Sequence, residues 1–417
     1  MSRSAELDQV PDGFDRRAPL DPLALLDHLD RLDAGALRRR GSLKWTAFPT
    51  EIAAWVAESD FGTAPAVTAA LHAATEAGAF GYLPPALRAE LADACARWHS
   101  ERYGWDVPPR WVKPVADVLE ALRITIEHFS RPGSPVIVPT PAYMPFVTAP
   151  QEWGREVIEV PLVPDGRRTT LDLDALADAI RAGGHLVLLT NPHNPTGRVY
   201  PRSELTALAE VVDRHGARVF SDEIHAPLVY PGARHIPYAS ISPAAAAHTV
   251  TATSASKAWN IPGLKCAQIL LSNDADEARW ASFDMLATHG ASTLGVVANT
   301  AAYRDGRPWL GALVEHLDGN RAALADVLAE RAPQIGHVPP EGTYLAWLDL
   351  RAALAASPDA PHDHLARWIG ERTGVALTDG AACGRAGRGF VRFNLAMPRP
   401  LVVEAGRRIA ACLDPSA

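Results

Sequence analysis

The sequence lacks any apolar run long enough to cross a membrane, and its amino terminus, MSRSAELDQVPDGFDRR, lacks the apolar core of a secretory signal. It has no excess of positive charge either: the formal net charge is -8, so neither a nucleic acid nor a membrane surface is an expected partner. Only four cysteines occur, far apart and without CxxC or histidine spacing, which argues against a disulfide framework and against a zinc site. We therefore expect a cytoplasmic protein with no metal.

What the chain does contain is typical of a large globular protein. It has 417 residues, of which 47% are hydrophobic and 21% charged, enough for a sizeable core and for two lobes. No internal repeat or low-complexity linker marks a boundary. The domain organisation therefore has to be predicted from the pattern of secondary structure.

Short β-branched runs alternate with helical periodicity between about residues 110 and 275. The runs are PVIVPTP, REVIEVPLV, HLVLLT, ARVFSDEI, HTVTAT and CAQILLS. This alternation predicts a mainly parallel sheet wrapped by helices. In the helical segment DVLEALRITIEHF, Asp117 and Glu120 are spaced as in a capping box, and Asp172 can cap the segment DLDALADAI.

After about residue 310 the pattern changes to a long amphipathic helix, the strands TYLAWLDL and GFVRFNLA with a helix between them, and a closing helix. This order predicts an α+β unit after an α/β one. The first sixty residues do not resemble the beginning of a Rossmann fold, and we expect them to pack against the carboxyl-terminal α+β unit. We predict an amino-terminal segment at 1–60, a large domain at 61–305 and a small domain at 306–417, with a crevice between the lobes.

Polar residues follow four of the predicted strands, in PTPAYMPF, TNPHNPTG, SDEIHAPL and SASKAWN. In a parallel sheet, ligands gather at the carboxyl ends of the strands, so these residues should converge on one place. An amine, a carboxylate, an amide and an aromatic ring that meet there suit pyridoxal 5'-phosphate (PLP). This cofactor needs a lysine for its aldehyde, an acid for its pyridine nitrogen, a donor for its phenolic oxygen and a ring to stack upon.

The ordered motifs NPHNPTG, SDEIH, SxSK and VRFNLAMPR resemble those of fold-type I PLP enzymes. Within them the chain resembles the C–S β-lyase (cystathionine β-lyase, MalY/PatB-like) group, which is related to class I and II aminotransferases. The resemblance runs from WVAESDF to MPR. It implies an aspartate aminotransferase-like α/β fold, with a large PLP-binding domain built on a mainly parallel seven-stranded sheet and a smaller α+β domain formed by both termini.

The resemblance also implies an activity: a PLP-dependent carbon–sulfur lyase that cleaves cystathionine, cysteine or a cysteine S-conjugate. The α,β-elimination would release a thiol, pyruvate and ammonia. The leaving group stays open, because the pocket depends on the amino-terminal segment and on the loop THGASTLG. An aminotransferase of a small amino acid, or a secondary-metabolism enzyme, would use the same residues, and a regulatory protein on the PLP fold is a third reading.

Roles carry over to individual positions. By the resemblance, Lys257 is the lysine that binds the cofactor's aldehyde and acts as general base, Asp222 keeps the pyridine nitrogen protonated, and Asn194 donates to the phenolic oxygen. Tyr143 matches the ring that stacks on the pyridine. Each of these residues could instead have a purely structural role. Asp222 could cap a helix, Asn194 could form a turn before proline, and Tyr143 could be an ordinary core residue.

Substrate contacts follow in the same way. Arg392 matches the arginine that binds the substrate α-carboxylate, with Asn194 beside it, and strand alternation places Arg392 and Asn394 on one face. Trp55 is expected to line the substrate pocket, with simple packing as its equal alternative. His225 occupies the position where aminotransferases of this fold usually have a tyrosine; we assign it to the cofactor site without a role, and a structural histidine is the alternative.

The phosphate group of the cofactor would be held by several elements together. Lys265 stands where relatives commonly have arginine, and Asp117, where they often have glycine, is expected to turn back as a helix cap. Tyr82 matches a tyrosine that relatives lend to the phosphate of the partner subunit, which implies a homodimer. The expected phosphate donors within the subunit are the hydroxyls of Ser254 and Ser256, the Lys265 amine, and the N–H groups of Val118 and Leu119.

Overall fold

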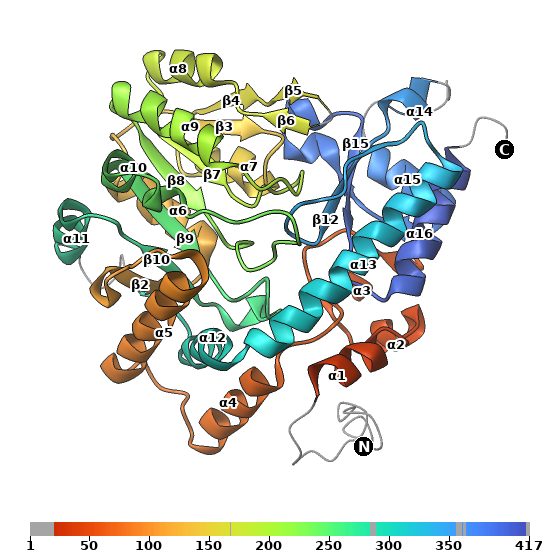
Figure 1. The fold of residues 1–417 in the computed structure, drawn as a ribbon, viewed down its shortest axis with the longest axis horizontal. Coiled ribbons are helices and arrows are strands. Elements are labelled where there is room, and N and C mark those ends of the chain that lie inside the picture. Colours follow the sequence, from red (N-terminus) through yellow and green to blue (C-terminus); the bar gives the residue numbers. More distant parts are fainter. Residues whose placement is uncertain (1–20, 167, 284–288, 356–360, 362–363, 414–417) are drawn as a thin grey trace.

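The computed structural model describes residues 21–166, 168–283, 289–355, 361 and 364–413. Its centre is a seven-stranded sheet in the order β2-β10-β9-β8-β7-β3-β4 (Figure 1). Strand β10 runs antiparallel to β2 and β9, and the remaining neighbours are parallel, so the predicted mainly parallel sheet is confirmed. The strands are β2 Val112–Val115, β3 Val136–Thr140, β4 Val157–Pro161, β7 Leu186–Thr190, β8 Arg218–Asp222, β9 Thr249–Thr253 and β10 Ala267–Leu270.

Helices cover both faces of this sheet because successive strand side chains point to opposite sides. Val136 and Val138 of β3 belong to a core cluster with α6 and α7, whereas Ile137 between them belongs to a cluster with α8 and α9. The helices of this part are α4 Pro65–Glu76, α5 Pro85–Tyr103, α6 Val118–His128, α7 Met144–Glu152, α8 Leu173–Arg181, α9 Arg202–Arg214, α10 Pro243–His248, α11 Asp274–Ala281 and α12 Thr293–Asp305.

Two predicted helix starts have the expected caps. The carboxylate of Asp117 accepts from the N–H of Glu120 at 2.9 Å, and that of Asp172 accepts from Ala175 at 2.9 Å. Each cap satisfies one of the first-turn N–H groups that a helix cannot pair internally. Both capping residues are confirmed, but the capping box is only half formed, because the Glu120 carboxylate binds Arg123 and not the N–H of Asp117.

A second sheet, β11-β12-β15-β14, is antiparallel and follows in the carboxyl-terminal part. The long helix predicted after residue 310 begins earlier, at Arg307, because Pro308 in its first turn fits a helix start. The elements are α13 Arg307–Arg331, β11 Gly336–His337, β12 Leu345–Asp349, α14 Arg351–Ala355, α15 Leu365–Thr373, β13 Val375–Ala376, β14 Thr378–Asp379, β15 Phe390–Asn394 and α16 Arg399–Cys412.

The amino-terminal residues lie beside these carboxyl-terminal elements (Figure 1). Strand β1 (Ile52–Ala53) pairs in parallel with β13, and Leu26 of α1 shares a core cluster with Ile409 of α16. The helices here are α1 Pro22–Leu29, α2 Ala34–Arg39 and α3 Leu43–Thr46. The domain limits at residues 60 and 305 remain predictions, and residues 1–20 of the first segment lie outside the described part.

Short elements complete the fold. A hairpin of β5 (Val163–Asp165) and β6 (Arg168–Thr170) extends from the end of β4. The 3-10 helices are η1 Pro109–Trp111, η2 Tyr238–Ser240, η3 Pro262–Leu264, η5 Gly380–Cys383 and η6 Arg385–Gly387. Within the described ranges, we find no helix that combines the length and the apolar character needed to span a bilayer.

Candidate active site

Four neighbouring strands deliver the predicted residues to one edge of the large sheet. In the registers of β7, β8 and β9, Thr190 pairs with Asp222, and Asp222 pairs with Ala252, so these three strands end level with one another. The loop with Asn194 follows β7, and the turn with Lys257 follows β9. Strand β3, next to β7, leads to Tyr143 at the start of α7. The convergence expected from the sequence is therefore present.

Lys257 is an amine without a carboxylate partner. The chain has four lysines, and Lys44, Lys113 and Lys265 all form ion pairs, whereas Lys257 forms none with the described residues. Its Nζ donates to the carbonyl of Ala57 at 2.9 Å. Burial lowers the pKa of the Lys257 amine to about 8, which leaves a substantial fraction of it neutral at mildly alkaline pH.

Charged side chains near the Lys257 amine also change its pKa. The guanidinium of Arg392 adds to the lowering of the Lys257 pKa by burial, while the carboxylates of Asp222 and Glu58 oppose it. An amine whose pKa is tuned by burial and by specific neighbours is typical of a functional site. The arrangement suits a nucleophile and proton carrier.

Asp222 is a buried acid at the end of β8, with an exposed fraction of 3%. Burial raises the pKa of its carboxyl group to about 7, although the N–H of Ile224 (3.1 Å) and the positive charge of Lys257 lower it. A nearby cation lowers the pKa of such a buried carboxyl group, so the group becomes ionised when a cation binds beside it. Asp222 can therefore hold a protonated heterocyclic nitrogen.

Arg392 is a buried guanidinium that meets no carboxylate among the described residues, with an exposed fraction of 2%. Its Nη1 donates to Oδ1 of Asn194 at 3.0 Å, and its Nη2 donates to the carbonyl of Trp55 at 3.0 Å and to Oγ1 of Thr378 at 3.2 Å. Neutral acceptors orient the cation and leave its charge uncompensated. The arrangement suits a bound carboxylate, which guanidinium groups hold through paired hydrogen bonds.

Asn194, Tyr143 and His225 surround the same space. Because the Oδ1 of Asn194 accepts from Arg392, its amide N–H groups remain as donors. Burial and the charge of Asp222 raise the pKa of Tyr143. Burial lowers the pKa of His225 to about 3, so its ring is neutral, and its Nδ1 has no partner among the described residues.

The predicted phosphate donors are arranged differently from the expectation. The Ser254 hydroxyl donates to the carbonyl of Cys266 at 2.7 Å and accepts from the N–H of Ser256 at 3.0 Å, so its single proton stays within the turn. The Ser256 hydroxyl has no such bond to a described residue. Lys265 pairs with Oδ2 of Asp117 at 2.9 Å, directly beside the start of α6. That start leaves the N–H groups of Val118 and Leu119 for a ligand, because Asp117 takes the one of Glu120.

Two further predicted residues are placed by their surroundings. The indole of Trp55 donates to the carbonyl of Lys44 at 2.9 Å and lies edge-on to Phe48, so Trp55 meets Arg392 through its carbonyl and not its ring. Tyr82 is 92% exposed, lines a surface pocket together with Phe80, and forms no hydrogen bond with the described residues of the cluster. Within one subunit the structure does not bring Tyr82 to Lys257.

Several residues of the site were missed in the sequence. Tyr344 donates its hydroxyl to the carbonyl of Ala57 at 3.0 Å, and its ring lies 5.9 Å from that of His225. Thr378 orients Arg392. Tyr344 belongs to TYLAWLDL, which predicts a strand and nothing more, and a backbone carbonyl such as that of Ala57 has no signal in a sequence.

These groups fit PLP. An amine that forms no ion pair with a described residue, a buried acid with a raised pKa, a buried imidazole nitrogen without a described partner and a buried guanidinium without a described carboxylate all lie at one edge of the sheet. Buried polar groups are rarely left unpaired unless a ligand or water completes them. The amine suits the aldehyde of the cofactor, the acid suits its ring nitrogen, and the guanidinium suits a substrate carboxylate, while the amide N–H groups of Asn194 remain for the phenolic oxygen.

Comparisons with known proteins lead to PLP-dependent enzymes. The family model for aminotransferase class I and II matches residues 56–409. The chain is 39% identical to the cystathionine β-lyase of Corynebacterium glutamicum, over 90% of this chain and 98% of that protein. A candidate PLP-dependent β-cystathionase from Corynebacterium diphtheriae superimposes with a TM-score of 0.84 at 38% identity, covering 92% of this chain and 98% of that one.

The PLP-bound C–S lyase from Staphylococcus hominis matches with a TM-score of 0.82 at 28% identity, over 90% of this chain and 96% of that one. The resemblance and the fold predicted from the sequence are both confirmed. The chain belongs to the aminotransferase class I and II family and, within it, to the group of the cystathionine β-lyases.

Proposed function

We propose that this protein is a PLP-dependent C–S β-lyase that acts on cystathionine or a related cysteine S-conjugate. In the overall reaction the bond between sulfur and the β-carbon breaks, one water is consumed, and a thiol, pyruvate and ammonia are released. The observation that carries the proposal is the Lys257 amine, which forms no ion pair with a described residue and lies together with the buried Asp222 and the uncompensated Arg392. The 39% identity to a cystathionine β-lyase supports the choice of reaction.

The cofactor is PLP, as in the relatives. Lys257 would bind its aldehyde, Asp222 its ring nitrogen and Asn194 its phenolic oxygen, with the ring of Tyr143 against the pyridine. The start of α6 with Val118 and Leu119, together with Ser256 and Lys265, would hold its phosphate. When bound, PLP supplies an electron sink for negative charge that develops at the substrate α-carbon.

The chain's own residues orient the substrate and move the proton. Arg392 binds the α-carboxylate, and its neutral acceptors, Asn194, Trp55, Thr378 and the Met144 sulfur, keep the guanidinium in one orientation. The Lys257 amine, with a pKa of about 8, can take the proton of the α-carbon near neutral pH as a general base. Asp222 remains ionised beside a protonated ring nitrogen and stabilises that positive charge.

The first experiment measures pyruvate. The enzyme loaded with PLP is incubated with cystathionine without any keto acid, and we expect equal amounts of pyruvate and thiol. Lys257→Ala should lower the rate by more than about 10³-fold because it removes both the nucleophile and the base. Lys113→Ala, which removes a lysine paired with Glu277 outside the site, is the matched control and should keep the activity.

The same assay distinguishes the rival activity. If product forms only when a keto acid is added, the protein is an aminotransferase and the lyase proposal is wrong. A panel of cysteine S-conjugates of increasing size, scored by pyruvate release, then identifies the leaving group that the pocket prefers.

The assembly and compartment belong to the same proposal. We infer a homodimer in which Tyr82 of each subunit contacts the phosphate bound by the other, and the exposure of Tyr82 and Phe80 supports this. We place the enzyme in the cytoplasm, which the four thiols Cys95, Cys266, Cys383 and Cys412 support. The partners are a small amino-acid substrate and a second copy of the chain, with no nucleic acid and no membrane.

A further inference from the structure

Residues 55–58, here called the strap, cross the site with every carbonyl bound by a side chain. The Trp55 carbonyl accepts from Arg392 at 3.0 Å, and the Ala57 carbonyl accepts from Lys257 at 2.9 Å. The carbonyls of Val56 and Glu58 both accept from the side chain of Asn394. The strap therefore touches the two cations to which the proposed reaction assigns the substrate carboxylate and the proton.

Asn394 holds the strap on both sides of Ala57. Its Nδ2 donates to Val56 at 2.5 Å and to Glu58 at 2.8 Å, which uses both amide protons, and its Oδ1 accepts from the N–H of Ala396 at 2.6 Å. The side chain is completely buried. Because it lies two residues after Arg392 on β15, Asn394 and Arg392 reach the strap from the same face of one strand.

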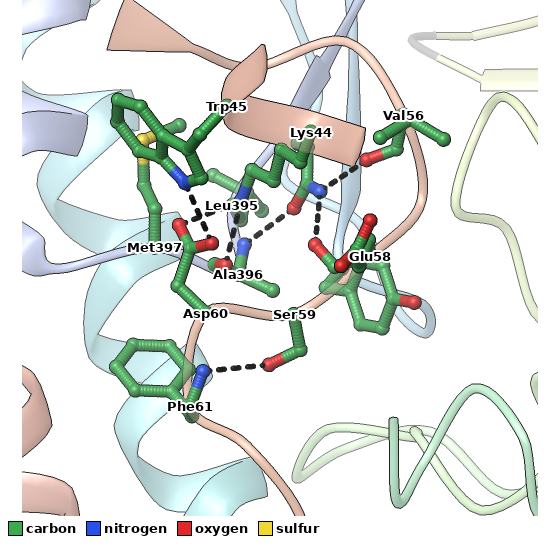
Figure 2. A network of polar contacts seen from close by, with 12 residues as sticks. Lys44, Trp45, Val56, Glu58, Ser59, Asp60, Phe61, Leu395, Ala396 and Met397 are labelled. Carbon is green, nitrogen blue, oxygen red and sulfur yellow. Dashed lines mark hydrogen bonds and ion pairs between the residues drawn. The ribbon is translucent and has the colours of Figure 1, made fainter. Parts of the chain in front are cut away.

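The far end of the strap has a separate anchor (Figure 2). Lys44 pairs with Asp60 at 2.8 Å and donates to the carbonyl of Ala396 at 2.9 Å, and the indole of Trp45 donates to Asp60 at 2.8 Å. The N–H of Asp60 also donates to Ala396 at 3.0 Å. This buried ion pair fixes the segment after the strap. Ala57 itself is held by Tyr344, which donates to its carbonyl at 3.0 Å, and by Asn394, which binds the residues on both sides of it.

We propose that Asn394 is a positioning residue of the reaction: through the strap it sets where the Ala57 carbonyl meets the Lys257 amine and where the Trp55 carbonyl meets Arg392. The kinetic consequence rests on the proposed lyase function. The effect on the amine does not, because the contact between Ala57 and Lys257 belongs to the chain alone.

The chain offers a closely matched control in Asn320. This residue is also completely buried, and its Nδ2 also donates to two carbonyls, those of Leu395 (2.9 Å) and Met397 (2.8 Å). Its Oδ1 accepts from Arg399 at 3.0 Å. Asn394→Leu and Asn320→Leu therefore remove the same number of donations from the same kind of site, but only Asn394 holds the strap.

Two measurements test the proposal on the full-length chain. In the loaded enzyme, Asn394→Leu should lower kcat/KM for cystathionine by about 10- to 100-fold, the cost of a displaced catalytic group. In the chain without cofactor, competitive acetylation followed by mass spectrometry gives the pKa of each of the four lysines. The value for Lys257 should fall by at least about half a unit, because the Ala57 carbonyl no longer favours the charged amine.

Asn320→Leu should lose similar thermal stability, yet keep kcat/KM within about threefold and leave the Lys257 pKa unchanged, because its bonds go to Leu395 and Met397 and none goes directly to residues 55–58. If both variants lose stability alike and neither changes Lys257 or kcat/KM, Asn394 is merely structural and the proposal is overturned. If wild type does not release pyruvate but the Lys257 pKa still falls only in Asn394→Leu, the lyase assignment fails and the positioning role stands. Should the Leu variants not fold, Asn394→Ser and Asn320→Ser remove the same donations and are judged by the same outcomes.

Discussion

At the scale of single residues, burial sets the protonation of the two groups that the reaction needs. Burial raises the pKa of Asp222 to about 7 and lowers that of Lys257 to about 8, so in the cofactor-free chain neither group is fully charged near pH 7.5. A cofactor with a cationic ring nitrogen would ionise Asp222. The site is therefore preorganised to be completed by a ligand and not by an internal ion pair.

The raised pKa of Asp222 leads us to predict how the free energy of unfolding of the cofactor-free chain depends on pH. In the folded chain Asp222 keeps its proton up to about pH 7, whereas in the unfolded chain it loses the proton at the ordinary aspartate pKa of 3.8. The stability contributed by this group therefore falls as the pH rises from about 4 to 7. Asp222→Asn removes this dependence. We compare the free energy of unfolding of Asp222→Asn with that of wild type by urea unfolding. From pH 5 to pH 8 the difference between them should change by about 3 kcal/mol in favour of the variant.

The control for this prediction is Asp165→Asn, which alters an exposed carboxylate in the β5–β6 hairpin. It should follow the pH dependence of wild type. If the free energy of unfolding changes with pH in the same way for Asp222→Asn and for wild type, the prediction is wrong. Asp222 would then already be ionised in the folded, cofactor-free chain.

At the scale of elements, the start of α6 combines a helix cap with an ion pair. Asp117 caps the helix through Oδ1 and holds Lys265 through Oδ2. A helix amino terminus attracts a phosphate, but a carboxylate beside it repels one. Asp117 therefore stabilises the helix and at the same time neutralises the lysine that stands nearest to it.

Asp117→Asn separates these two effects, because asparagine is an equally good cap without the negative charge. We expect PLP to bind about 3- to 10-fold more tightly, since Lys265 is released and the repulsion is removed. Fluorescence titration of the cofactor-free enzyme measures this. Asp172→Asn, at the cap of α8, is the matched control and should leave the affinity unchanged; weaker binding in Asp117→Asn would show instead that Asp117 orients Lys265 toward the phosphate.

Elements also show how far the sequence predicts this site. The strand ends carrying Asp222 and Lys257 were predictable, because apolar runs that stop at a polar residue mark where a buried strand emerges. The strap was not predictable, because its partners lie far away in the sequence: Ala57 and Lys257 are 200 residues apart, and Tyr344 is 287 residues from Ala57. The turn of the Ser254 hydroxyl toward Cys266 likewise depends on a tertiary contact that no local pattern records.

At the scale of the whole molecule, both ends of the chain build the proposed substrate-binding side of the site. The Trp55 carbonyl comes from the amino-terminal segment, and Arg392 and Thr378 come from the carboxyl-terminal sheet. The pairing of β1 with β13 fixes the strap next to that sheet. If Arg392 binds the substrate as proposed, substrate binding is coupled to the packing of the two termini, whereas the proposed cofactor contacts come from the large sheet.

The proposed dimer completes the cofactor side, and mixed subunits test it. Subunits with Tyr82→Ala are unfolded and refolded together with subunits carrying Lys257→Ala, which are inactive alone. If Tyr82 acts across the interface, each mixed dimer contains one site with both Lys257 and Tyr82 intact, so random mixing should restore about a quarter of the wild-type activity. If Tyr82 acts within its own subunit, no site in a mixed dimer has both residues, and the mixture will not exceed the activity of Tyr82→Ala alone. Light scattering on the same samples measures whether the 44.7 kDa chain forms a dimer.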